Sequence, residues 1–180
     1  MSPPSPSLRA LLLPALLLAP LPALADDEGR GVAGLLRQIE GLPEAAAFRA
    51  RHPDPPAALM ALSQDEKRPA WLRLRALDAL ARFPEPRVEA FLGELAAKTD
   101  AQTASAAQHA AVAVLIRTFP KEAAARLPAV LSHPDPELRV TAVKIALAGV
   151  APEPKAAARD WMARMRDSYV ERALGEPAPK

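Results

Sequence analysis

The spacing of its prolines constrains the fold of this chain more than any other feature. Most of its 21 prolines stand in pairs or clusters, and several clusters separate apolar segments. These separating clusters are Pro53/Pro55/Pro56, Pro84/Pro86, Pro134/Pro136 and Pro152/Pro154. Proline is tolerated in the first turn of a helix but breaks a helix interior. The prolines therefore predict a series of helices of about 10–16 residues, close to the usual globular length.

The composition agrees with an all-α fold. Alanine and leucine are abundant, β-branched residues are sparse, and only 7 glycines occur in 180 residues. Helix propensity is therefore high along almost the whole chain. No segment has the composition or alternation of a strand.

The N-terminus has the three regions of a secretory signal peptide, which we assign to residues 1–25. Arg9 supplies a positive charge, residues 10–25 carry no charge, and residues 23–25 form a small-x-small cleavage site. We expect export to the periplasm or the extracellular space, with cleavage after Ala25. The alternative is an uncleaved membrane tether, although the apolar stretch is shorter than the ~20 residues of a spanning helix.

The rest of the chain has the size of one domain. We assign residues 26–174 to a helical domain and residues 175–180 to a disordered tail. The whole chain has a net charge of +2, and basic and acidic residues are interspersed. This pattern argues against a nucleic-acid partner. The chain has no cysteine, so neither a disulfide nor a lipid-anchored cysteine is possible.

Internal similarity indicates a repeated unit. Residues 72–77 (LRLRAL) align with residues 138–143 (LRVTAV) at an offset of 66, which is twice 33. Phe83 and Phe119, each followed by proline, are 36 residues apart. Periods in the thirties are typical of solenoids built from helix pairs.

A His-Pro-Asp-Pro sequence also occurs twice, at residues 52–55 and 133–136. Together these similarities predict four helix pairs and one final helix. We place them near residues 32–51, 56–82, 86–118, 121–148 and 154–174.

Residues 127–147 resemble a HEAT repeat. The resemblance implies a right-handed α-α superhelix, a HEAT-like solenoid of about four to five helix pairs. It also implies a first helix kinked at Pro128, a second helix capped by Asp135, and an Arg139 that joins a ladder between repeats. Arg73 stands at the ladder position of an earlier unit, whereas the middle unit has His109 there.

The second helices of a HEAT stack line its concave face, which makes their polar residues candidates for partner binding. The C-terminal segment adds a tryptophan and a methionine at helical spacing, although closure of the stack would equally explain them. The residues that we expect at a partner surface are Arg75, His109, Lys144, Trp161 and Met165.

No constellation of residues indicates catalysis, a cofactor or a metal. The three histidines lack ligand spacing, and no phosphate-binding loop or nucleophile elbow occurs. We therefore expect a non-catalytic scaffold or complex subunit that binds a protein or peptide. HEAT-like folds also include alkylpurine DNA glycosylases and bilin lyases, so an enzyme or lyase-like chaperone with a cleft near Trp71 and Asp78 is an alternative. A membrane-tethered subunit is another.

Overall fold

The computed structural model describes residues 31–38, 41–99 and 105–175. Within these ranges the chain forms ten helices and no strand, which confirms the all-α prediction. The helices are α1 (Val32–Leu36), α2 (Ala45–Arg49), α3 (Pro55–Gln64), α4 (Ala70–Leu80), α5 (Pro86–Ala96), α6 (Ala106–Thr118), α7 (Pro120–Val130), α8 (Pro136–Ala148), α9 (Pro152–Met165) and α10 (Ser168–Ala173). The predicted signal peptide and residues 176–180 lie outside the described part.

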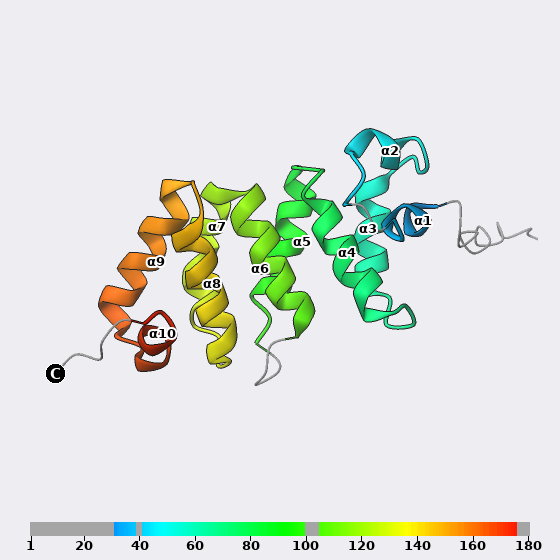
Figure 1. Ribbon diagram of the computed structural model, residues 1–180. Coiled ribbons are helices and arrows are strands. Elements are labelled where there is room, and N and C mark those ends of the chain that lie inside the picture. Colours follow the sequence, from blue (N-terminus) through cyan, green and yellow to red (C-terminus); the bar gives the residue numbers. More distant parts are fainter. Residues whose placement is uncertain (1–30, 39–40, 100–104, 176–180) are drawn as a thin grey trace, which may run out of the picture.

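Helices that alternate along the chain pack into two rows (Figure 1). One row contains α3, α5, α7 and α9, each in contact with the next. The second row contains α1, α4, α6, α8 and α10, again in contact in that order. Contacts of α3 with α4, α5 with α6, α7 with α8, and α8 with α9 join the two rows.

Prolines start helices as their spacing predicts. A proline occupies the first turn of α3, α5, α7, α8 and α9. It lacks an N–H that would in any case have no intrahelical acceptor there, and its fixed φ suits the helix. Pro128 is different, because it lies inside α7, close to its end at Val130.

The predicted single helix over residues 154–174 is wrong. The chain leaves the helix at Arg166, which has a left-handed φ of +49°, and α10 starts afresh two residues later. The Asp167 side chain accepts the N–H groups of Tyr169 and Val170 and so caps α10. The predicted pair over residues 32–51 consists of two short helices, α1 and α2.

The two His-Pro-Asp-Pro sequences form the same local turn. His52 Nδ1 accepts the N–H of Asp54 at 3.0 Å, and His133 Nδ1 accepts the N–H of Asp135 at 2.9 Å. Each aspartate then caps the helix that follows. The two turns nevertheless lie in different rows, since one precedes α3 and the other α8. The motif therefore repeats a cap and does not mark equivalent positions of a helix pair.

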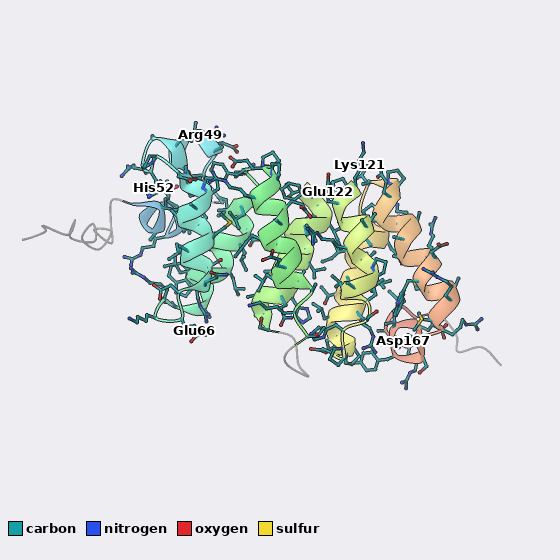
Figure 2. All side chains as sticks on the ribbon, turned by 180° about the vertical axis from the view of Figure 1, so that it is seen from behind. Arg49, His52, Glu66, Lys121, Glu122 and Asp167 are labelled. Atoms are coloured by element: carbon teal, nitrogen blue, oxygen red, sulfur yellow. The ribbon has the colours of Figure 1, made fainter. Side chains whose placement is uncertain are left out.

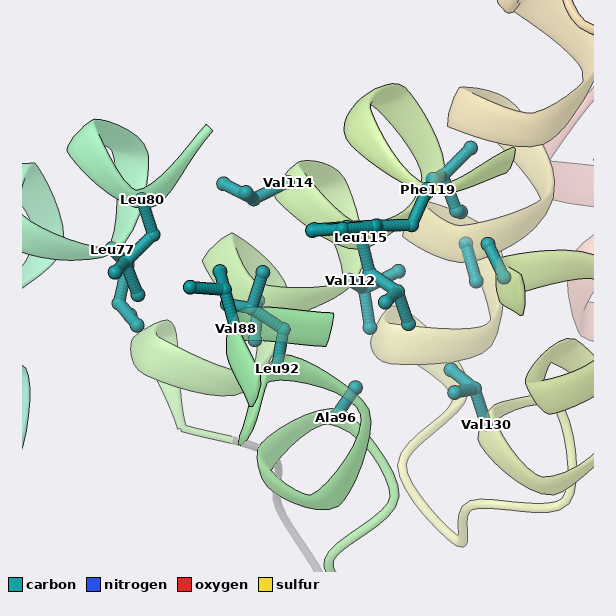
Figure 3. Close-up of a cluster of buried hydrophobic side chains, with 14 of the residues drawn as sticks. Leu77, Leu80, Val88, Leu92, Ala96, Val112, Val114, Leu115, Phe119 and Val130 are labelled. Atoms are coloured by element: carbon teal, nitrogen blue, oxygen red, sulfur yellow. The ribbon is translucent and has the colours of Figure 1, made fainter. Parts of the chain in front are cut away.

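Helix α6 lies at the centre of the packing. It contacts α4, α5, α7 and α8, and none of residues 110–116 is exposed. Figure 3 shows its side chains Val112, Val114 and Leu115 between those of the neighbouring helices. Each such side chain contributes about 1.5–3 kcal/mol when it is fully buried. A helix without a polar face is stable in water only when neighbours cover it on nearly every side, as here.

No helix in the described part of the chain has the length and apolarity needed to cross a membrane.

A matched pair of substitutions tests this packing. Val114 in α6 is fully buried, whereas Val150 after α8 is fully exposed. We expect Val114→Ala to lower the free energy of unfolding by about 2–3 kcal/mol, because it removes two buried methyl groups and leaves a cavity. Val150→Ala should change it by less than about 0.5 kcal/mol. Urea unfolding followed by circular dichroism measures both values, and equal effects would contradict the assigned burial.

Candidate binding surfaces

Two polar side chains of the second row bind neighbouring elements of that row. Arg75 of α4 donates from Nη2 to the carbonyls of Gln38 at 2.9 Å and Gly41 at 2.7 Å. His109 Nδ1 of α6 lies 3.0 Å from Thr141 Oγ1 of α8. Arg75 and His109, both expected at a partner surface, thus hold the row together.

Asp78, which lies one turn further along α4 than Arg75, is also paired. Asp78 pairs with Arg117 of α6 at 3.5 Å, across a largely exposed surface. Such an exposed pair contributes little stability, typically below about 1 kcal/mol. Lys144 of α8 is exposed, and no hydrogen bond or ion pair joins its side chain to another described residue.

Three residues share the expected ladder position, the fourth residue of a second-row helix. They are Arg73 in α4, His109 in α6 and Arg139 in α8. Their contacts differ. Arg73 Nε is buried and has no hydrogen-bond partner among the described residues, whereas His109 contacts Thr141. These positions therefore do not form one continuous chain of arginine–carboxylate pairs.

Arg139 makes the most extensive contacts of the three. Its Nε donates to Asp167 Oδ2 at 2.8 Å, and its Nη1 donates to the carbonyls of His133 at 2.7 Å and Pro134 at 3.0 Å. Arg139 and Asp167 are each mostly buried, with 17% of the side chain exposed. The arginine thus connects the turn before α8 to the cap of α10.

The Asp167 carboxyl is stabilised in its charged form. Burial opposes ionisation, but the N–H groups of Val170 and Tyr169 and the positive charge of Arg139 outweigh it. The pKa of Asp167 is therefore lower than its ordinary value of 3.8. Tyr169 makes a second link to α8, because its hydroxyl donates to Glu137, and this hydrogen bond raises the pKa of Tyr169.

A pocket of about 480 Å³ opens beside this ion pair, and we call it the terminal pocket. Its lining comes from the α7–α8 turn, α8, the end of α9 and the start of α10. The lining residues are Leu131, Ser132, His133, Arg139, Trp161, Met165, Asp167 and Ser168. Asp167, labelled in Figure 2, marks its place at the C-terminal end of the two rows.

Two expected surface residues, Trp161 and Met165, meet in the terminal pocket but differ in depth. Met165 is 62% exposed, as a docking residue would be. Trp161 is 6% exposed and belongs to the core cluster, so its expected place at the surface is corrected. Helix α9 packs against α7 and α8, and Trp161 lies on its covered side.

His133 also lines this pocket, although it was not among the residues expected at a partner surface. Its side chain is 1% exposed. Because Nδ1 accepts the N–H of Asp135, the ring proton of the neutral imidazole is on Nε2. That buried Nε2 has no hydrogen-bond partner among the described residues. An unmet buried donor typically costs about 1–3 kcal/mol, and such groups call for an explanation.

The backbone beside the terminal pocket is strained. Arg166 is the one described residue other than glycine with a positive φ. A left-handed conformation costs a non-glycine residue roughly 1–2 kcal/mol. Strain of this kind often accompanies binding sites, where the surrounding packing maintains it. An unmet donor, a strained residue and an exposed methionine therefore occur together.

A second pocket, of about 500 Å³, lies where α6 and α8 end and α9 begins. Its lining is mostly apolar and includes Ile116, Ile145 and the fully exposed Val150, with Arg117 at its edge. Lys144, the residue before Ile145 in α8, does not line this pocket.

Trp71 and Asp78 are the residues of the alternative enzymatic cleft. A pocket of about 550 Å³ is lined by Trp71 but not by Asp78. Asp78 is two turns further along α4 and pairs with Arg117. In the described ranges, no group of three or more histidine or acidic side chains is placed to hold a metal ion.

No family model, curated protein or solved structure matches this chain.

The charge of Asp167 gives a pH-dependent test of the terminal pocket's framework. A carboxyl with a lowered pKa stabilises the fold above its unfolded-state pKa, and this stability disappears as the pH falls through the folded-state pKa. Asp167→Asn keeps a capping side chain but removes the charge. We expect it to lower the free energy of unfolding by about 1–3 kcal/mol at neutral pH.

The difference between wild type and Asp167→Asn should shrink towards zero as the pH falls below the ordinary carboxyl value of 3.8. Urea unfolding over a pH series measures it. Asp160→Asn, which removes an exposed charge from the same helix pair, is the control and should have little effect. A difference for Asp167→Asn that stays constant with pH would contradict the assigned ion pair.

Proposed function

We propose that the protein is an exported HEAT-like repeat module that binds a protein or peptide partner without catalysing a reaction. The alternation of helices between two rows supports the repeat architecture. The resemblance of residues 127–147 to a HEAT repeat agrees with it, since Asp135 caps α8 and Arg139 contacts the next helix pair. Repeats of this kind commonly use their extended surfaces for recognition.

The observation that carries the proposal is the buried, unmet Nε2–H of His133 beside the terminal pocket. A peptide carbonyl is the simplest acceptor for such a donor. The His133 donor is covered, so the carbonyl reaches it only after a side chain in the lining shifts. Met165 lines the same pocket, and unbranched thioethers adapt readily to a partner's shape.

The apolar part of the lining defines the rest of the partner's chemistry. Leu131 and Trp161 are buried, whereas Met165 is largely exposed. An apolar side chain of the partner would pack against these three groups. Arg139 and Asp167 neutralise each other in the lining of the pocket. The pocket therefore favours a neutral peptide segment over a charged one.

Export is the part of the proposal that depends on the sequence alone. Residues 1–25 have the organisation of a signal peptide. Mass spectrometry of the native protein tests it: a chain that starts at Asp26 supports export with cleavage. A chain that retains residues 10–25 contradicts cleavage and supports the membrane-tethered alternative.

Site-specific photocrosslinking in cells tests partner binding at the terminal pocket. A photoreactive amino acid at Ser168 should capture a discrete partner, whereas the same group at Lys144 should not. Met165→Glu should reduce capture at Ser168 by about fivefold or more, because it places a charge among apolar groups. Arg159→Glu is the matched control on the exposed side of α9 and should leave capture unchanged.

Capture at Lys144 but not at Ser168 would place the partner on the second row and contradict the terminal pocket as the docking site. Capture at neither position would contradict partner binding by this half of the chain.

A further inference from the structure

The pocket around Trp71 lies at the other end of the molecule from the terminal pocket. It is lined by Arg37 after α1, by four residues of the α3–α4 turn, and by the first turn of α4. In order, the lining residues are Arg37, Asp65, Lys67, Arg68, Pro69, Trp71 and Leu72. Figure 2 labels Glu66 in this turn and Asp167 at the terminal pocket, at opposite ends of the rows.

The Trp71 pocket carries an excess of positive charge. Three of its lining side chains are cations and one, Asp65, is an anion. Glu66 is exposed in the same turn but does not line the pocket. A concave site with charges of one sign concentrates the opposite charge more strongly than a flat surface does. The pocket therefore favours an anionic ligand, although the chain as a whole is nearly neutral.

Asp65 holds the turn in a fixed shape. Its carboxylate accepts the backbone N–H of Lys67 at 3.0 Å and the Nε of Arg68 at 3.3 Å. These contacts fix the backbone at Lys67 and the side chain of Arg68 before any ligand arrives. A binding group that is held in advance loses less conformational freedom when the ligand binds.

Trp71 gives the pocket an aromatic wall. It is 49% exposed, although indole is among the largest apolar surfaces that a side chain offers, whereas Trp161 is 6% exposed. Tryptophan is the residue most enriched at binding hot spots, and flat apolar groups stack well on its ring. Leu72 and Pro69 add further apolar surface beside it.

We propose that the Trp71 pocket binds an organic anion, a carboxylate or phosphate attached to a flat apolar body. The charged group contacts Lys67, and the apolar body stacks on Trp71. Both halves contribute, so neither an inorganic anion nor a neutral aromatic molecule binds comparably. This site is separate from the terminal pocket and does not depend on the proposed peptide partner.

NMR spectroscopy tests the proposal, with the buried Trp161 as an internal control for Trp71. In the ¹⁵N-labelled wild-type protein each indole N–H gives its own NMR signal, and Trp71→Phe identifies that of Trp71. The probes are phenyl phosphate and N-acetylphenylalanine, compared with inorganic phosphate and N-acetylphenylalanine amide. We expect at least one aromatic anion to shift the Trp71 signal saturably, in the millimolar range or below, and to leave Trp161 unmoved.

Phenyl phosphate carries a phosphate and N-acetylphenylalanine a carboxylate, so the tighter binder of the two shows which group the pocket prefers. Lys67→Ala should weaken that binding by roughly two- to fivefold, as expected for a partly exposed ion pair. Lys121→Ala, which removes an exposed lysine from α7, should leave it unchanged. The proposal is overturned if neither aromatic anion shifts the Trp71 signal, or if the neutral amide or inorganic phosphate shifts it equally.

Discussion

The burial of α6 is the constraint on which the rest of this structure depends. Its residues 110–116 have no polar side chain, so this helix must be covered by others to be stable in water. Helices α4, α5, α7 and α8 provide that cover. Since α4 and α8 flank it in one row while α5 and α7 lie in the other, covering α6 fixes the order of both rows.

Polar contacts refine this packing and do not create it. Of the ion pairs described between second-row elements, Asp78 with Arg117 is largely exposed and contributes little to stability. The effect of such contacts is to fix how neighbouring helices lie side by side. Towards the C-terminus the constraint weakens, because α10 is short and contacts chiefly α8. The strained Arg166 and the unmet donor of His133 both occur at this end of the molecule.

Much of the fold could be predicted from the sequence, because its signals are local. Prolines in first turns depend only on the missing N–H, and the apolar segment of α6 depends only on its own composition. The capping role of Asp135 is equally local. The break at Arg166 is not, since no glycine or proline marks it and Asp167 is held there by Arg139 from another helix.

The site residues were harder to predict for the same reason. Whether a tryptophan is covered depends on what packs against its helix, and so Trp161 is in the core while Trp71 is half exposed. Asp78 lies two turns further along α4 than Trp71 and pairs with Arg117 of α6, so it does not line the Trp71 pocket. His133 has the same turn as His52, but only its position in the second row buries it and leaves its Nε2 without an acceptor. No pattern within the motif distinguishes the two.

Backbone hydrogen exchange, followed by mass spectrometry, tests the central role of α6 most directly. Amides of a helix that the whole fold must cover exchange only through global unfolding, whereas those of less constrained elements exchange through local opening. The amides of α6 should therefore exchange the most slowly in the protein, with those of α10 exchanging much faster. If the amides of α6 exchange as fast as those of α10, this helix does not hold the two rows together.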